Sequence, residues 1–228
     1  MSADDGDIYL NGTYTKVMGS GSLARMWSRI HRSMEAPYRS RSYSRILEVG
    51  AGSGEHLPHV LSSWVDYHLT DVRLEPLLES GPFPDRVHVE QQDVQSLTYP
   101  ADHFDRVVLS CVLPHVPDPV LSLAELHRVA APGCDVTIFV PCEPGIALRA
   151  ARAIVTIPKN KKLGVHDPYY GHFREHIHYF SALNHYIHRE FAADIIKERS
   201  YPFPHLGWNA NLYRIYHIKI AKSSPASS

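Results

Sequence analysis

The stretch RILEVGAGSGEH at positions 45–56 constrains the fold of this chain more than any other. Its apolar run at 46–49 predicts a buried strand, and glycines follow directly at positions 50, 52 and 54. Glycine permits positive φ and lets the backbone approach a ligand closely. Parallel sheets bind their ligands outside the carboxyl ends of strands, which is where these glycines fall. The stretch therefore predicts an α/β fold with a ligand at the end of its first strand.

Further apolar segments continue an alternation of strands and helices along the chain. We expect strands at 66–70, 86–90, 106–113, 135–140, 194–200 and 212–220, and helices at 57–64, 120–130 and from a cap at Ser181 to about 193. Alternating strands and helices favour parallel pairing through right-handed crossovers. The prediction is a doubly wound, mostly parallel seven-stranded sheet with helices on both faces, in a single domain over residues 1–228.

Two segments outside this alternation are expected to cover the ligand. Residues 22–36 carry apolar side chains at helical spacing, which predicts an amphipathic helix within an N-terminal cover of residues 1–40. Residues 142–180, rich in proline, tyrosine and histidine, form an insertion after the fifth strand that is too long for an ordinary loop, and we expect a lid. The tail 221–228 is expected to be disordered.

Composition excludes several classes of partner. Of 228 residues, 44% are hydrophobic, which suffices for one domain with its own core. The formal net charge of -1 gives no basic excess, so no nucleic-acid partner is expected.

The N-terminus does not resemble a signal peptide, and no apolar run is long enough for a membrane span. Three cysteines without metal-ligand spacing suit a reducing, cytoplasmic location. The oligomeric state cannot be deduced from the sequence.

The residues around the glycines distinguish two kinds of nucleoside cofactor. A dinucleotide fingerprint has the order G-x-G-x-x-G and places a pyrophosphate on the helix that follows. In this chain the third glycine comes one residue early, and Glu48 stands at the strand end, where a carboxylate would repel a pyrophosphate. S-adenosylmethionine carries a sulfonium and an ammonium group and no phosphate. The pattern therefore favours S-adenosylmethionine.

These segments together resemble a known family. LEVGAGSGEH resembles the first motif of the class I (Rossmann-like) S-adenosylmethionine-dependent methyltransferases, hydrophobic–hydrophobic–E/D-x-G-x-G-x-G. Asp71, in LTDVR, matches the family's ribose-binding acid, and Asp93, in QQDVQSL, matches the acid that binds the adenine amino group. The segments at 104–119 and 132–141 resemble the family's later strand motifs. The resemblance covers about residues 45–141 and implies S-adenosyl-L-methionine as the cofactor.

The resemblance also implies which residues meet this cofactor. They come from the entry helix, the glycine loop and the ends of the next three strands: Arg32, Glu48, Gly50, Ala51, Gly52, Gly54, Asp71, Val72, Asp93, Val94 and Ser110. Cys111, in an apolar run, is expected to be an inert core residue.

The acceptor side is expected to depend on histidines. His115 follows the fourth strand between two prolines, where it could be a general base, a cofactor contact or a structural residue, and His176 is a second catalytic candidate. The expected acceptor-binding residues are His115, Glu143, His166, Tyr169, Tyr170 and His172. His172 and His176 have the spacing of one helical face, but no established metal motif surrounds them, and we predict no metal.

The function expected from this resemblance is in-line methyl transfer to a small-molecule acceptor, at oxygen, nitrogen or carbon. The acceptor's proton would then require a base with a pKa near neutrality, which suits histidine. Two alternatives stay open. One is a descendant that binds the cofactor without methylating, such as a cyclase or a scaffold protein. The other is a nicotinamide dehydrogenase, which the early third glycine disfavours.

Overall fold

The computed structural model describes residues 21–162, 164–165 and 167–222, and its centre is a seven-stranded sheet in the order β3-β2-β1-β4-β5-β7-β6. Strands β1 to β5 are parallel, and β7 runs antiparallel to both β5 and β6. The strands are β1 (Ser42–Val49), β2 (Ser63–Asp71), β3 (Val87–Gln91), β4 (Phe104–Ser110), β5 (Ala130–Pro141), β6 (Ile195–Tyr201) and β7 (Tyr213–Lys219). The predicted doubly wound, mostly parallel sheet is confirmed.

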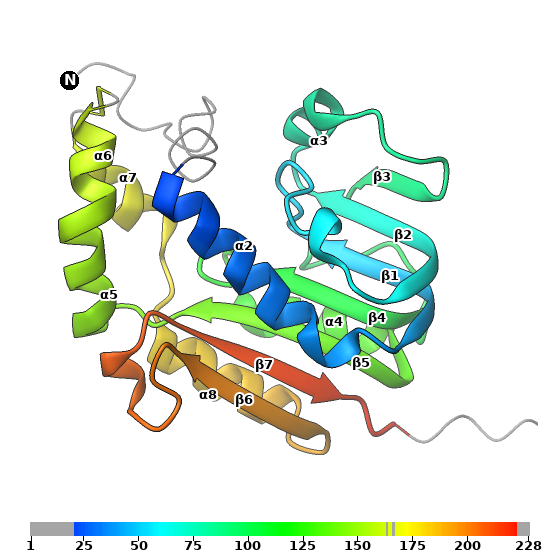
Figure 1. Cartoon of the computed structure of the whole chain (residues 1–228). Coiled ribbons are helices and arrows are strands. Elements are labelled where there is room, and N and C mark those ends of the chain that lie inside the picture. The colour runs from blue at the N-terminus through cyan, green and yellow to red at the C-terminus, as the bar shows by residue number, and fades with distance from the viewer. Residues whose placement is uncertain (1–20, 163, 166, 223–228) are drawn as a thin grey trace, which may run out of the picture.

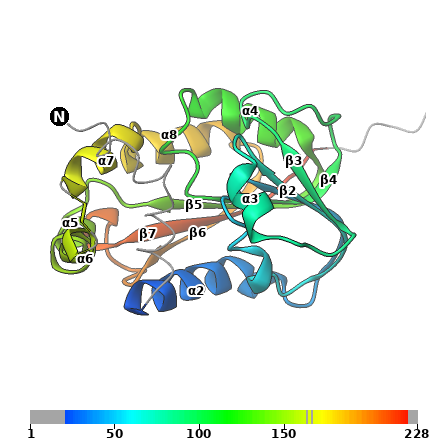
Figure 2. The same cartoon turned by 90° about the horizontal axis from the view of Figure 1, so that it is seen from above.

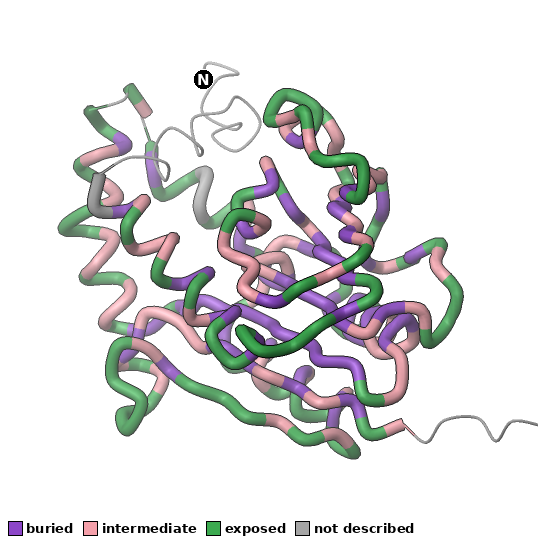
Figure 3. Tube along the Cα trace, turned by 45° about the vertical axis from the view of Figure 1, so that its right-hand side comes forward, coloured by how far each residue is buried: buried purple, intermediate pink, exposed green. Residues whose placement is uncertain are grey.

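Helices cover both faces of this sheet (Figures 1 and 2). Helix α2 (Gly21–Glu35) lies on one face, where it shares a core with α3 (Glu75–Ser80). Helices α4 (Pro119–Val129) and α8 (Phe180–Glu190) pack on the opposite face. Three short 3₁₀ turns complete this part of the fold: η1 (Ala36–Tyr38), η2 (Leu57–His59) and η4 (Trp208–Ala210). Buried residues concentrate along the strands and on the inner sides of the helices (Figure 3).

The predicted N-terminal amphipathic helix is confirmed as α2. Leu23, Ile30 and Met34 are buried against the sheet, whereas Arg25, which lies between them in sequence, is exposed. This division of apolar and charged side chains between two faces is what helical spacing predicts. Because α2 crosses the sheet in front of β4 and β5 (Figure 1), it forms one wall of the space beyond their carboxyl ends.

The start of α4 is fixed by its own sequence. The Asp118 side chain accepts hydrogen bonds from the backbone amides of Val120 and Leu121, and Pro119 occupies the first helical position. A carboxylate cap followed by proline is a strong helix start. The cap ends the loop that connects β4 to α4, which carries His115.

Two predicted details of secondary structure are wrong. Residues 57–64 do not form a helix: a short turn at η2 leads into β2, where Trp64 pairs with Tyr43 of β1. Only positions 57–62 lie between the glycine loop and β2, which is fewer than two turns of an α-helix. Ser181 does not cap α8, because the helix begins at Phe180 and no side chain caps it.

The segment predicted as a lid folds into four successive helical elements. They are α5 (Ile146–Ala151), a π-helical turn η3 (Arg152–Thr156), α6 (Ile157–Lys162) and α7 (Pro168–Glu175). Pro158 cannot donate to the carbonyl one turn earlier, and the wider π turn before it accommodates that missing bond. The continuous column from α5 to α6 stands beside the sheet (Figure 1). Residues 1–20 of the predicted cover and 223–228 of the predicted tail lie outside the described residues.

Among the residues that the structure describes, no helix is both long enough and apolar enough to cross a membrane.

Candidate active site

A cavity of about 1680 Å³ opens at the carboxyl ends of the parallel strands. Its walls come from α2 on one side and from the segment 141–179 on the other. Most of the residues predicted for the site line it together: Glu48, Gly50, Ala51, Gly52, Asp71, Val72, Asp93, Val94, Ser110, His115, Glu143, Tyr169 and His176. The predicted cofactor and acceptor residues thus share one space.

The glycine loop after β1 forms the floor at one end. Gly50 has a φ of +65°, and a Cβ atom there would come within 2.2 Å of Val112 Cγ2, in the loop after β4. Gly52 has a φ of +59° with open space around it. Both positions need the left-handed backbone that glycine adopts without strain. Only Gly50 also requires the absence of a side chain, because β1 and β4 are neighbours.

Asp71 is oriented at the edge of this loop by backbone amides. The Gly52 amide donates to Asp71 Oδ2 at 2.9 Å, and the Arg73 amide donates to Oδ1 at 3.0 Å. The carboxylate is half-buried and faces the cavity. A carboxylate held on two amides is preorganised to accept further hydrogen bonds from hydroxyl groups such as those of a ribose.

The end of β3 supplies the next acid. Asp93 is exposed and accepts hydrogen bonds from the Gln95 amide at 2.9 Å and from the Gln95 side chain at 3.3 Å. Val94 beside it is only 5% exposed, so it forms an apolar surface at the cavity wall. An exposed acid next to a buried aliphatic side chain suits a flat, partly polar ring such as an adenine.

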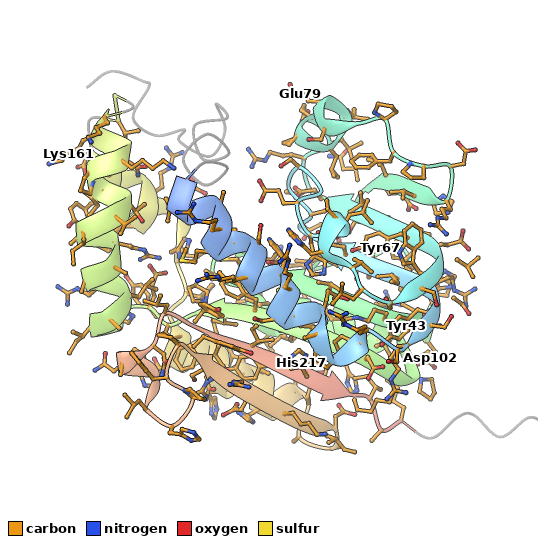
Figure 4. All side chains as sticks on the ribbon, viewed as in Figure 1. Tyr43, Tyr67, Glu79, Asp102, Lys161 and His217 are labelled. Atoms are coloured by element: carbon orange, nitrogen blue, oxygen red, sulfur yellow. The ribbon has the colours of Figure 1, made fainter. Side chains whose placement is uncertain are left out.

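Glu48 sits deeper in the same end of the cavity. It is 2% exposed, and the Tyr67 hydroxyl of β2 donates to its Oε2 atom. Figure 4 shows Tyr67 on β2, to the right of α2. Burial raises the pKa of Glu48, because the charged carboxylate loses its hydration. A cation bound beside Glu48 would favour the ionised form.

Helix α2 is tied to the sheet by a buried polar network. Arg106 of β4 donates to Glu35 at 2.6 Å, and His56 contacts Glu35 at 3.1 Å. His31 continues the chain of contacts to His56, with 2.9 Å between their Nδ1 atoms. These four side chains are at most 4% exposed. His31 and His56 also line the cavity, so the network joins the wall to the floor.

The electrostatics of this network favour fixed charge states. Burial, together with the neighbouring His56 and His59, lowers the pKa of His31 to about 3. Glu35 acts in the opposite direction, but its effect is smaller. Burial alone would raise the pKa of Glu35, but Arg106 and His56 outweigh it and lower the pKa to about 2. The network therefore holds an ionised Glu35 and a neutral His31 near neutral pH.

The other end of the cavity gathers His115, His176 and Glu143. The rings of His115 and His176 meet edge to face, with their centroids 4.5 Å apart. Glu143 Oε2 contacts Nδ1 of the buried His176, and Arg152 of η3 pairs with the other carboxylate oxygen of Glu143. A carboxylate on Nδ1 fixes the orientation and tautomer of an imidazole and stabilises its protonated form.

Backbone hydrogen bonds hold these side chains in place across long stretches of sequence. The amides of Ile177 and His178 donate to the carbonyl of Pro114 at 3.0 and 3.3 Å, which ties the chain after α7 to the loop that carries His115. The Phe180 amide donates to the Glu143 carbonyl at 2.9 Å. The acceptor end is therefore built where three loops meet: those after β4, β5 and α7.

Cys111 was expected to be an inert core residue, but the structure places it on the cavity wall. It directly follows β4 and has a φ of +60°, a left-handed backbone that non-glycine residues seldom adopt. Burial raises the pKa of its thiol to about 12. Strained backbone at a cavity wall is a frequent mark of a functional position.

Several predicted site residues are not brought to the cavity. Arg32 and Tyr170 are exposed and are not among the described residues that line it. Gly54 is buried, and a Cβ there would lie 3.3 Å from the ring of Phe83, so this glycine serves packing rather than ligand approach. His166 lies outside the described residues, and for His172, within α7, only the backbone is described.

Other residues at the site were not found by sequence reasoning. His31 and Trp27 line the cavity from α2, where the family resemblance pointed to Arg32 instead. Arg152 pairs with Glu143 across the lid segment, and no spacing pattern in the sequence connects the two.

The polar groups of the cavity fit S-adenosylmethionine better than a dinucleotide. Glu48, Asp71 and Asp93 place three carboxyl groups around the glycine loop, where a pyrophosphate would meet repulsion. The same groups suit an ammonium or sulfonium charge, a ribose diol and an adenine amino group. Glu48 would lie nearest the cationic part, Asp71 would hold the ribose, and Asp93 with Val94 would receive the adenine.

Comparison with known proteins points to the same kind of cofactor. Residues 22–190 match the family model of the methyltransferase domain. The ubiquinone/menaquinone biosynthesis C-methyltransferase UbiE of Vibrio vulnificus is 27% identical over 124 residues, which is 50% of this chain and 46% of that protein. UbiE of Coxiella burnetii is 28% identical over 143 residues, 57% of each protein. The chain thus spans about half the length of these relatives.

Solved structures show the same fold at low sequence identity. A SAM-dependent methyltransferase from Thermotoga maritima superposes with a TM-score of 0.62 at 14% sequence identity, and the match covers 96% of this chain and 97% of that one.

Proposed function

The chain belongs to the family of methyltransferase domains, and we propose that it transfers a methyl group from S-adenosylmethionine to a small-molecule acceptor bound in the same cavity. The observation that carries the proposal is the shared cavity. Carboxylates suited to the cofactor line one end, and a carboxylate-backed histidine pair lines the other. The two relatives are named as C-methyltransferases, which makes carbon one acceptor atom to test alongside oxygen and nitrogen.

When bound, S-adenosylmethionine supplies an electrophilic methyl group on a positively charged sulfur. The protein's part is to hold the acceptor in line with that methyl group and to keep water away, since much of the acceleration in such reactions comes from orientation. Ser110 and the loop after β4 border the space between the two ends of the cavity. The buried side chain of Phe139, in the cavity wall, would exclude water around it.

His115 and His176 are proposed as the catalytic residues, in contact with the acceptor. His176 has Glu143 behind it, an arrangement that raises the basicity of an imidazole and favours loss of the acceptor's proton toward this end of the cavity. Glu143 then acts as a positioning residue rather than as a direct acceptor ligand. Tyr169, from α7, lines the wall beside them and is proposed to contact the acceptor's body.

Helix α2 and the segment 142–180 are proposed to cover the acceptor. Both line the cavity from outside the sheet, and α5 exposes apolar side chains such as Ile146, which is 68% exposed. Apolar surface near a cavity mouth is consistent with a segment that closes over a ligand. Slower hydrogen exchange in both segments on adding cofactor would support this role, and unchanged exchange in both would contradict it.

The experiment that tests the function is unbiased with respect to the acceptor. The protein is incubated with methyl-labelled S-adenosylmethionine and a small-molecule extract of the host, and labelled products are identified by mass spectrometry. A labelled small molecule that the Asp71→Ala variant fails to form would support the proposal. Cofactor binding without any labelled product would instead favour a non-methylating descendant. Tight binding of NAD without S-adenosylmethionine would indicate a dehydrogenase.

A further inference from the structure

Three side chains at the acceptor end have the composition and the proximity of a metal site. The Sγ atom of Cys111 and one ring nitrogen each of His115 and His176 all lie within 4.8 Å of one another. In a tetrahedral zinc site, bond lengths of about 2.0–2.3 Å put neighbouring ligand atoms roughly 3.3–3.6 Å apart. The three atoms are therefore at most about 1.5 Å farther apart than the ligand atoms of such a site.

The surroundings of His176 match those of a metal-ligating histidine. Such a histidine commonly gives one ring nitrogen to the metal and the other to a carboxylate, which fixes the tautomer. In this protein Glu143 contacts Nδ1 of His176, and Arg152 holds Glu143 from the other side. Nε2 is then the ring nitrogen from which His176 would bind an ion.

The backbone also presets the three ligands. Cys111 has a left-handed backbone, and the loop from Cys111 to His115 is closed by a hydrogen bond from the His115 amide to the Val112 carbonyl at 2.9 Å. The amides after His176 are bonded to Pro114 in the same loop. Ligands held on rigid backbone in this way reduce the cost of assembling a metal site.

We propose that Cys111, His115 and His176 bind a divalent transition-metal ion of the zinc type, with its fourth position open toward the acceptor. One thiolate and two imidazoles are ligands that zinc favours, and three protein ligands with an open position are typical of catalytic rather than structural sites. All three residues line the cavity, so the open position would face its interior. The spacing of these three residues in the sequence matches no metal-binding motif, because only the tertiary fold brings His176 close to Cys111 and His115.

This proposal rests on the proposed methyl transfer and specifies the acceptor class, an acceptor with an ionisable hydroxyl or thiol group. Coordination lowers the pKa of such a group, and its proton leaves to water. The acceptor's electron pair then forms the bond to the methyl carbon, and the electron pair of the broken carbon–sulfur bond stays on sulfur. In metal-free protein, one of the two imidazoles has to accept the proton instead.

The test begins with metal content and a spectrum, neither of which needs an acceptor. Protein without a histidine tag is dialysed against a moderate chelator, and its zinc is counted by mass spectrometry. The expected result is one zinc ion per chain. Replacing zinc by cobalt(II) should give tetrahedral ligand-field bands and a thiolate-to-cobalt charge-transfer band, which requires a cysteine ligand in the wild-type protein itself.

Variants then separate this site from other histidines, of which the chain has sixteen. Cys111→Ser should remove the charge-transfer band, and Glu143→Gln should weaken zinc binding by about 10- to 100-fold, as loss of a carboxylate behind a ligand does elsewhere. His88→Gln is the matched control, because this partly exposed ring lies on the edge strand β3, outside the cavity lining, and the substitution should leave binding unchanged.

Several outcomes would overturn the proposal: a zinc-free wild-type protein, a cobalt spectrum without thiolate absorption, or zinc retained equally by Cys111→Ser. Melting temperatures check that each variant is folded. Calorimetry with S-adenosylhomocysteine on metal-free protein separates this proposal from the proposed function. Cofactor binding without a metal site would leave only the function standing, whereas metal binding without cofactor binding would leave only the metal site.

Discussion

The two ends of the cavity are built in different ways. The cofactor end is made of consecutive strand ends, β1, β2 and β3, whose parallel register brings Gly52, Asp71 and Asp93 side by side. The acceptor end is made of three loops that are distant in sequence and joined by backbone hydrogen bonds to Pro114 and Glu143. One end follows from strand order alone, while the other depends on how the insertion after β5 packs back onto the sheet.

This difference suggests a division of labour. Backbone amides and buried contacts fix the carboxyl groups of Asp71 and Glu48, so the cofactor end can be rigid before any ligand arrives. The acceptor end carries the histidines, and its outer wall is a column of partly exposed helices. Substitutions at the cofactor end should change cofactor affinity, and substitutions at the acceptor end should change turnover.

The largest effect is expected where α2, which borders both ends, is anchored to the sheet. Glu35→Gln would leave the buried guanidinium of Arg106 without its ionic partner and should lower the free energy of unfolding by about 3–5 kcal/mol. Urea denaturation measures the change. Glu79→Gln, on the outer side of α3 (Figure 4), is the control and should stay within about 0.5 kcal/mol.

A double variant sharpens that test. Replacing both partners, as Glu35→Leu with Arg106→Met, removes the unpaired charge and should recover most of the lost stability. If Glu35→Gln is as stable as the wild type, the anchor does not hold α2, and the rigid wall of the cofactor end needs another explanation.

The next largest effect concerns the acceptor end. His115→Gln should reduce turnover by at least ~100-fold while leaving cofactor affinity within about twofold, because the ring lies at the acceptor end of the cavity and is proposed to act there. Steady-state kinetics and calorimetry measure the two quantities. His205→Gln, at an exposed loop position, is the matched control. Weaker cofactor binding with nearly normal turnover would indicate that His115 contacts the cofactor. The proposed separation of roles between the two ends of the cavity would then be wrong.

The converse is expected of the cofactor end. Asp71→Ala removes a carboxylate proposed to accept two hydrogen bonds from the ribose and should weaken cofactor binding by ~10-fold or more. Calorimetry with S-adenosylhomocysteine provides the measurement, and Asp85→Asn, an exposed acid before β3, provides the control. Unchanged affinity in Asp71→Ala would remove this residue from the site.

A separate effect depends on pH and on the neutral state of His31. Its folded pKa of about 3 lies below the ordinary value of 6.5, so between these values the unfolded chain binds a proton that the folded protein does not. The free energy of unfolding should therefore fall as the pH is lowered through this window, by up to ~1.4 kcal/mol per pH unit for one proton. Above pH 6.5 this contribution to stability is fully present.

His31→Gln should make that dependence shallower. Urea denaturation between pH 6.5 and 4.5 is informative, because Glu35, with a folded pKa of about 2 and an ordinary value of 4.5, titrates mainly below this range. His185→Gln, an exposed position on α8, should leave the slope unchanged. An identical slope in His31→Gln and wild type would show that His31 is not held neutral by burial.

Sequence reasoning succeeded where the determinants are local. The run 46–49 with its glycines predicted the β1 strand and its loop, and the acids at 71 and 93 fall at the cavity because parallel strands end on the same edge. It failed at 57–64, where the apolar residues suit a helix but pairing with β1 draws Trp64 into a strand. Strand pairing outweighed local periodicity there.

The sequence by itself therefore determined the fold class, the order of the strands that hold the cofactor residues, and the chemistry of the cofactor end. Only the tertiary structure joined Cys111, His115 and His176, placed Arg152 on Glu143, and put His31 rather than Arg32 on the side of α2 that faces the cavity. The physical reason is the separation of the interacting residues along the sequence. Strand register follows from neighbouring segments, whereas contacts between loops depend on the packing of the whole chain.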